Sequence, residues 1–292
     1  MITRILLYFM IIHPVAVFSQ GLWNNPSEIQ PTVYLVGSIH NMHLDQKNHY
    51  SINDLLAQIS ALKPDLVCGE ITPEAYNQPM EGYFPPEAAF LAEMADELNY
   101  RFVPVDWRLD YSTQTLAGKE VPSSINEQSA ALVKSIFAKQ EASNSQSLYD
   151  FLHAEATIND LDSLYEKIIG MNTLAEISSG SWHERNRRAV ENGLTAAGNA
   201  HIIVFVFGID HLPQLKHQLK SRGIDAHIPQ RLFTPGNDHM VSTAVLKRWQ
   251  RNLQNLELIR DKKIPVTYDN YQKVINSKRI EDLQAMIRQF NN

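Results

Sequence analysis

Two apolar, β-branched runs, far apart in the chain, end in the same way. The run 32–38 ends around a glycine and leads to His40, and the run 201–207 is followed by a glycine and leads to His211. Short, continuous apolar runs that end at glycine indicate buried strands. We therefore expect both histidines to lie just beyond the carboxyl ends of two strands.

Similar apolar runs alternate with segments of helical period over much of the chain. In the segment 51–62, Ile52, Leu55 and Ile59 recur at the spacing of one helix face, and Ser51 stands where an N-cap is expected. Further strands are predicted at 65–70, 100–106 and 224–228, and further helices at 86–98 and 211–221. This alternation predicts an α/β fold with a mainly parallel central sheet flanked by helices.

The pattern changes to helices alone from about residue 121 to 198. A second candidate cap, Ser124, opens the first of four predicted helices, at 124–141, 148–156, 160–169 and 181–197. The sheet resumes directly afterwards, so we read 121–198 as a helical insertion in one domain that spans 20–292. Two amphipathic segments, 237–258 and 273–290, predict C-terminal helices.

The first 19 residues have the pattern of a secretory signal. Arg4 precedes an apolar stretch that Pro14 interrupts, and Ser19 offers a cleavage point. A buried N-terminal helix or a membrane anchor is the alternative, but Pro14 and the short length disfavour a span of about 20 residues. We expect an exported protein, periplasmic or extracellular, with no stable membrane span after cleavage.

Composition narrows the function classes. The net charge is −6 and no basic stripe is visible, which disfavours nucleic acid as a partner. Cys68 is the only cysteine, so no internal disulfide can form, and its position within an apolar run indicates a small buried side chain. The sequence does not indicate an oligomeric state.

Four titratable side chains follow predicted strands directly: His40, Glu70, Asp106 and His211. Ligands of open parallel sheets bind at the carboxyl ends of the strands. Two imidazoles and a carboxylate at one rim can hold a divalent metal that activates water, with His40, Glu70 and His211 as ligands. The same set can perform acid–base catalysis without a metal. We expect Gly37 and Gly208 to allow a tight turn and a close backbone approach there.

Other polar residues near this rim have two interpretations each. Asp106 either binds substrate or is a structural carboxylate that bonds Arg108. His43 and Asp45 either add metal ligands or lie on an exposed loop, and we favour the loop.

Arg185 and Asn186 belong to a charged helix that precedes the second histidine strand. They lie either on a solvated face or at the site, where the guanidinium of Arg185 could bind a substrate carboxylate or stabilise an oxyanion.

Taken together, four short motifs resemble the TraB/GumN/Tiki superfamily. They are Gly37-Ser38-Ile39-His40, Gly69-Glu70, Glu184-Arg185-Asn186 and Gly208-Ile209-Asp210-His211. The resemblance covers about residues 30–230. It implies that His40, Glu70, Arg185 and His211 are catalytic, that Asn186 binds and orients the substrate, and that manganese or cobalt is bound, as in Tiki-type proteases. Erythromycin esterase-like relatives use a similar set without an evident metal.

The leading hypothesis is an exported hydrolase, metal-dependent through manganese, cobalt or zinc, that cleaves a peptide or a small-molecule ester. A metal-free esterase is one alternative. The other is a ChaN-like protein that binds haem or another small ligand without turnover, with contacts from His43, Tyr76, Met80 and Tyr83.

Overall fold

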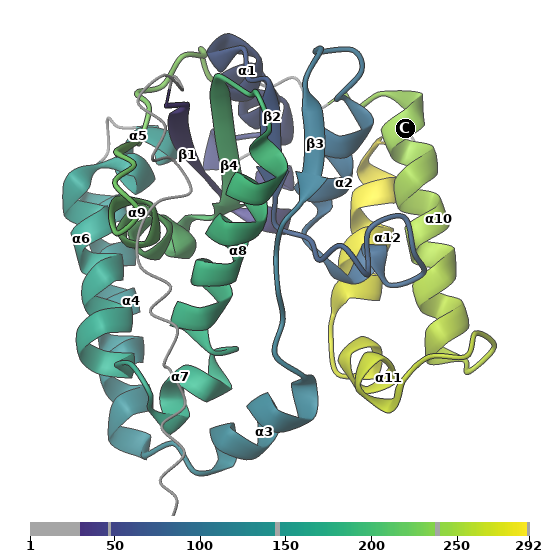
Figure 1. Ribbon diagram of the computed structural model, residues 1–292. Coiled ribbons are helices and arrows are strands. Elements are labelled where there is room, and N and C mark those ends of the chain that lie inside the picture. The colour runs from purple at the N-terminus through teal and green to yellow at the C-terminus, as the bar shows by residue number, and fades with distance from the viewer. Residues whose placement is uncertain (1–29, 46–47, 144–146, 237–239, 291–292) are drawn as a thin grey trace, which may run out of the picture.

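Five parallel strands form the central sheet, in the order β3-β2-β4-β1-β5 (Figure 1). The strands are β1 (Thr32–Ser38), β2 (Leu66–Gly69), β3 (Arg101–Pro104), β4 (Ile202–Gly208) and β5 (Ala226–His227). The computed structural model describes residues 30–45, 48–143, 147–236 and 240–290. The α/β fold and all five predicted strands are confirmed, whereas the predicted signal at 1–19 lies outside the described residues.

The two strands that precede the histidines are neighbours at the centre of the sheet. β1 pairs with β4 in parallel, with Ser38 opposite Gly208. The chain leaves β1 through α1 (Ile52–Leu62) toward β2, and leaves β4 through α9 (Leu212–Lys220) in the opposite direction toward β5. The carboxyl ends of β1 and β4 therefore form a topological switch point, where a crevice for ligands is expected.

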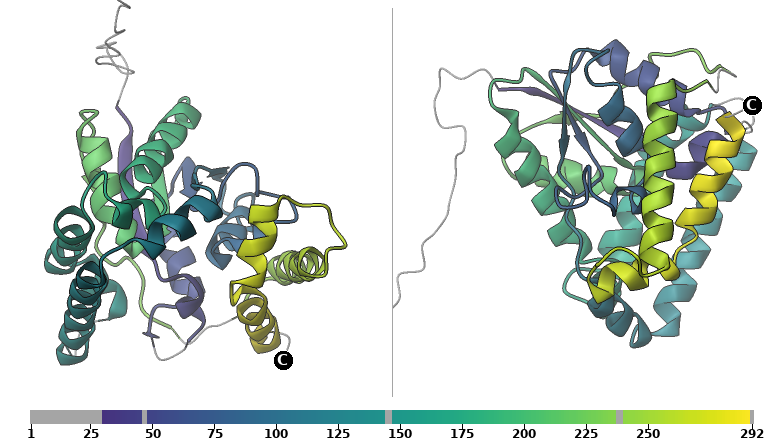
Figure 2. Two further views of the ribbon diagram at one scale, coloured as in Figure 1. Left: turned by 90° about the horizontal axis from the view of Figure 1, so that it is seen from below. Right: turned by 90° about the vertical axis from the view of Figure 1, so that its right-hand side faces the viewer.

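Helices cover both faces of the sheet. One face packs against α1, α2 (Pro86–Glu93), α10 (Thr243–Arg260) and α12 (Arg279–Phe290), and the other packs against α8 (Trp182–Ala197) and α9. Figure 2 shows α10 and α12 packed beside each other on the outer side of the first layer. Alternate residues of β4 serve the two layers, because successive side chains of a strand point to opposite faces: Val204 and Val206 face the first, and Ile203, Phe205 and Phe207 the second.

The segment between β3 and α8 is helical and extends beyond the carboxyl ends of the strands (Figure 1). It consists of α3 (Tyr111–Lys119), α4 (Ser123–Ala142), α5 (Leu148–His153), α6 (Glu155–Ser163), a π-helical turn (Leu164–Ile169) and α7 (Leu174–Ser178). The prediction missed α3 because this helix buries only Ala117 and so has no apolar stripe.

Several predicted helix boundaries were wrong. The predicted helix 148–156 is interrupted at Ala154, whose ψ of 141° is extended, and the segment 273–290 is divided between α11 (Tyr268–Ile275) and α12. Helix α2 ends at Glu93. Among the described residues, no helix is long and apolar enough to cross a bilayer.

Of the two predicted N-cap serines, Ser51 forms the cap and Ser124 does not. Ser51 accepts a hydrogen bond from the Asp54 amide (3.0 Å), and the Asp54 carboxylate accepts one from the Ser51 amide (2.8 Å). Ser124 caps nothing, because α4 begins one residue earlier, after Pro122, without a side-chain cap.

This difference gives a matched test of helix capping. We expect Ser51→Ala to lower the free energy of unfolding by about 1 kcal/mol, because it removes the hydroxyl that accepts from the Asp54 amide. Ser124→Ala should change it by less than about 0.5 kcal/mol. Urea unfolding followed by circular dichroism measures both, and equal losses in the two variants would contradict the assignment of the caps.

Candidate functional site

A cavity of about 370 Å³ lies beyond the carboxyl ends of β1, β2 and β4. Its walls include four of the predicted site residues: His40, Glu70, Arg185 and His211. Residues Ser277, Lys278, Arg279 and Asp282, at the start of α12, line it as well. The site thus joins residues from the sheet, from α8 and from the C-terminal helices.

Glu70 is the centre of this site. Its Oε1 accepts hydrogen bonds from Arg185 (2.7 Å) and Arg108 (3.1 Å), and its Oε2 accepts one from the backbone N–H of Gly208 (2.7 Å). The Nε2 atoms of His40 and His211 each lie 3.8 Å from one of its oxygens. Burial alone would raise the pKa of Glu70, but the charged His40 ring and the guanidinium groups of Arg185 and Arg108 hold it well below its usual range. Glu70 is therefore ionised.

Asp106 lies beneath Glu70 and is 1% exposed. Both of its oxygens accept hydrogen bonds from Arg185 (2.8 and 3.0 Å), and Arg108 Nε donates to Oδ2 (2.7 Å). Because Asp106 does not line the cavity, its geometry is that of the structural carboxylate and not of a substrate ligand. The Arg108 side chain is 27% exposed and does line the cavity.

His211 is held as a neutral imidazole. The Asn186 side-chain amide donates to the Trp182 carbonyl (2.8 Å), so its Oδ1 is free to accept a hydrogen bond from His211 Nδ1 (2.8 Å). The proton on Nδ1 leaves a lone pair on Nε2, which faces Glu70. Burial, aided by Arg185, holds the pKa of His211 well below its usual value. Trp182 stacks on the ring, with the centroids 4.1 Å apart.

His40 is held as an imidazolium. Its Nδ1 donates to Glu87 Oε1 (2.7 Å), an oxygen that also accepts from the Ser38 hydroxyl. Burial lowers the pKa of His40, but the carboxylates of Glu87 and Glu70 outweigh it and raise the pKa to about 9. The two predicted histidines thus differ in charge at neutral pH, although they end similar motifs.

The turn that carries His40 is fixed by two other histidines. His40 itself has a φ of 52°, a left-handed conformation that is unusual outside glycine. His153 Nε2 accepts the Gly37 N–H (2.9 Å), and His43 Nε2 accepts the Ile39 N–H (3.0 Å). Burial lowers the pKa of both His43 and His153 to about 4, so both rings stay neutral and accept these bonds.

The favoured prediction for His43, an exposed loop, was wrong. The side chain is 0% exposed, and its Nδ1 bonds the Tyr50 carbonyl (2.9 Å), so both ring nitrogens have backbone partners. It is also no ligand for a metal or haem as it stands. Asp45 is exposed, as the loop prediction requires.

Gly37 and Gly208 allow neighbouring side chains to approach the backbone closely, and neither has an unusual backbone conformation. Gly208 has an ordinary φ of −49°. A Cβ at this position would lie 2.6 Å from His40 Nε2, and a Cβ at Gly37 would lie 2.4 Å from Ile209 Cδ1. The missing side chain of Gly208 is what lets the His40 ring cross the end of β4.

Sequence reasoning missed Glu87, the residue that fixes the charge of His40. Glu87 sits in the first turn of α2, which the Pro start predicts, and is 3% exposed. Nothing in its local pattern distinguishes it from a surface glutamate. Because Glu87 lies in the first turn of α2, the helix dipole favours a carboxylate there, but this does not predict the contact with His40.

The donor set, as arranged, does not fit a divalent metal. Within the described ranges, no group of three or more His, Cys, Asp or Glu side chains is placed to hold one. The oxygens of Glu70 already accept bonds from two guanidinium groups and a backbone amide, which opposes a second cation there. The manganese, cobalt or zinc site stays a prediction.

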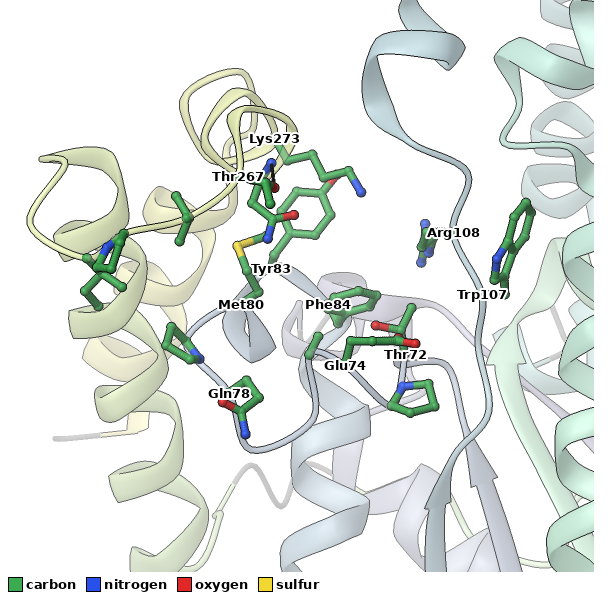
Figure 3. A pocket seen from close by; sticks show the side chains of 17 residues that line it. Thr72, Glu74, Gln78, Met80, Tyr83, Phe84, Trp107, Arg108, Thr267 and Lys273 are labelled. Atoms are coloured by element: carbon green, nitrogen blue, oxygen red, sulfur yellow. Dashed lines mark hydrogen bonds between the residues drawn. The ribbon is translucent and has the colours of Figure 1, made fainter.

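A second cavity, of about 910 Å³, adjoins the first through Tyr83 and Arg108 (Figure 3). It lies between the loop after β2, the segment after β3 and α11. Lys273 reaches over the Tyr83 ring, with Nζ 5.9 Å from the centroid. Met80 and Tyr83, two of the proposed haem contacts, line this cavity, whereas Tyr76 packs on Phe102. Haem binding stays a prediction.

Comparison of the chain with protein-family models, with curated proteins and with solved structures finds no match. The resemblance to the TraB/GumN/Tiki superfamily therefore rests on the four motifs alone.

The charge of His40 can be measured directly. We expect the ring to titrate near pH 9 by NMR, and Glu87→Gln to move its pKa down toward 6.5, because the largest favourable charge is lost. Since the folded pKa is raised, this pair stabilises the fold fully below pH 6.5 and stops doing so as the pH rises through 9.

The exposed residue Glu97 offers a matched control. Glu97→Gln should leave the His40 titration where it is. A His40 pKa near 6.5 in the unsubstituted protein would contradict the assigned ion pair.

Proposed function

We propose that this chain is a hydrolase that cleaves an ester or amide bond by acid–base catalysis at the β1–β4 switch point. The observation that supports it most is the unequal pair of histidines on one carboxylate. His211 is neutral and His40 is charged, and both present Nε2 to Glu70 at 3.8 Å. Titratable groups whose environments separate their pKa values are the mark of acid and base roles.

In this proposal His211 is the general base. Its Nε2 lone pair faces the cavity side of Glu70, so a water in the cavity that donates a hydrogen bond to Nε2 can lose a proton to it as the water attacks the carbonyl carbon. Asn186 acts through His211, because its Oδ1 fixes the tautomer that leaves Nε2 unprotonated. Asn186 is thus a positioning residue and not a direct substrate contact.

His40 is the general acid. It donates its Nε2 proton to the leaving oxygen or nitrogen when the tetrahedral intermediate collapses, and Glu87 holds the ring through Nδ1. One water is consumed, and the products are an acid and an alcohol or amine. The proton gained by His211 returns to His40 across the Glu70 carboxylate, which lies between the two rings.

The guanidinium groups supply the electrostatic contribution. Arg108 is the more exposed of the two and lines both the first and the second cavity, so we assign it to the oxyanion that develops on the carbonyl oxygen. Arg185 is 5% exposed and holds Glu70 and Asp106 in place. Its predicted catalytic role is then exerted through Glu70.

Substitutions of the base and of its partner test the proposal. We expect His211→Gln to lower kcat by about 10²–10⁴-fold on a panel of p-nitrophenyl esters and peptides, the usual contribution of one acid–base group. Asn186→Leu should lower kcat with a smaller change in KM. The exposed His217, which does not line the cavity, provides the control His217→Gln, and that variant should keep full activity.

Chelation separates this proposal from its metal-dependent form. Activity should persist after dialysis against EDTA, with less than one metal ion per chain by elemental analysis. Activity that is lost in EDTA and restored by manganese, cobalt or zinc would contradict the metal-free mechanism. A Soret band on addition of haem, without hydrolysis of any substrate, would favour the binding-protein alternative.

The pH profile gives a second test. The groups that face His40 are Glu87 on α2, Glu70 after β2, Asp210 after β4 and Arg279 on α12. The carboxylates of Glu87 and Glu70 have the largest effect among them. Because the acid must be protonated, kcat/KM should fall as the pH rises through about 9. In Glu87→Gln this alkaline limb should move to lower pH. An alkaline limb that stays in place would show that His40 is not the acid.

A further inference from the structure

A third cavity lies on the other side of the same strand ends, and its character is different. It encloses about 280 Å³ and shares His40, Gly208 and Asp210 with the polar site cavity. The rest of its wall is mostly apolar and comes from the helical segment between β3 and α8. Ile136, Phe151 and Leu161 form a small buried cluster there, and Ile209 packs against it.

The mouth of this cavity is also apolar. Met42, Val133 and Phe137 line it and are 44%, 36% and 52% exposed. Exposed large apolar side chains that gather around a concave surface indicate a binding site for an apolar group. Among the described residues that line it, the only ionisable ones are His40 and Asp210, which it shares with the polar cavity.

The positions of the proposed acid and base indicate which part of a substrate would bind in the apolar cavity. His40, the general acid, borders the apolar cavity, whereas His211, the base, does not. The leaving group must lie next to the acid. The opposite side of the reacting bond faces the remainder of the polar cavity, whose wall includes the cations Arg108 and Lys278.

We infer that the apolar cavity binds the leaving-group side of the substrate, and that the substrate is an ester or amide of an aliphatic or aromatic alcohol or amine with a polar, anionic acyl part. This inference rests on the proposed function for the assignment of the two sides. The volume suits a chain of several carbon atoms, since one water in the liquid occupies about 30 Å³.

A series of n-alkyl monoesters of succinate, from ethyl to hexyl, tests this specificity. Primary alkanols of this series are similar leaving groups, so differences in rate report on binding of the chain. We expect kcat/KM to rise roughly fourfold per methylene until the cavity is filled, the factor that corresponds to burial of one methylene.

Variants at the mouth provide matched controls. Val133→Trp, at an exposed position on α4, should reduce the preference for hexyl over ethyl by roughly sixteenfold, equal to the loss of about two buried methylenes. Ala138→Trp, on the same helix but outside the cavity wall, should leave that preference unchanged. Equal losses in the two variants would overturn the inference.

A binding measurement makes failure of the inference distinguishable from failure of the proposed function. Methyl NMR shifts of Ile209 and Leu161 on titration with 1-hexanol or ethanol need no turnover. If no ester is hydrolysed but hexanol binds more tightly than ethanol and Val133→Trp weakens it, the apolar site stands and the hydrolase proposal fails. Hydrolysis without chain-length preference, together with equal binding of the two alcohols, would overturn the apolar site alone.

Discussion

The ion-paired carboxylate of Glu70 is the interaction on which the rest of the site depends. A buried carboxylate without partners costs several kcal/mol, and here two guanidinium groups and a backbone amide satisfy its oxygens. Asp106 in turn holds both guanidinium groups. Three carboxylates, of Glu70, Asp106 and Glu87, form ion pairs with three cations, of Arg185, Arg108 and His40, so each charge of this network has a partner of opposite sign.

The two histidines show how similar motifs acquire different chemistry. Both follow a central strand and present Nε2 to the same carboxylate. Their Nδ1 atoms differ, because one meets a carboxylate and the other an amide oxygen. The carboxylate of Glu87 favours the charged form of His40, whereas the amide oxygen of Asn186 is compatible with the neutral form of His211. The hydrogen-bond partner of Nδ1 therefore decides which histidine is the acid and which is the base. The GxxH motif alone does not decide this.

The sequence could predict what depends on local pattern and topology. Continuous apolar runs located all five strands, and the rule for parallel sheets placed His40, Glu70 and His211 at one rim. It could not predict Glu87, whose contact with His40 spans two separate elements, nor the buried state of His43, which depends on backbone amides folded over it. Helix α3 was also not predicted, because an exposed helix has no periodic pattern of apolar residues in its sequence.

The strand order has a consequence for how the chain folds. β1 and β2 follow each other in sequence but are not neighbours, because β4 lies between them. Without β4 the sheet consists of two separate pairs, β2 with β3 and β1 with β5, because β4 is the strand that joins them. Closing the long loop from β1 to β4 is slow, since its entropy is lost before the contacts form. Pairing of β4 with both β1 and β2 completes the sheet and is also what places His40 and His211 beside Glu70, so completion of the sheet and assembly of the catalytic pair depend on the same strand.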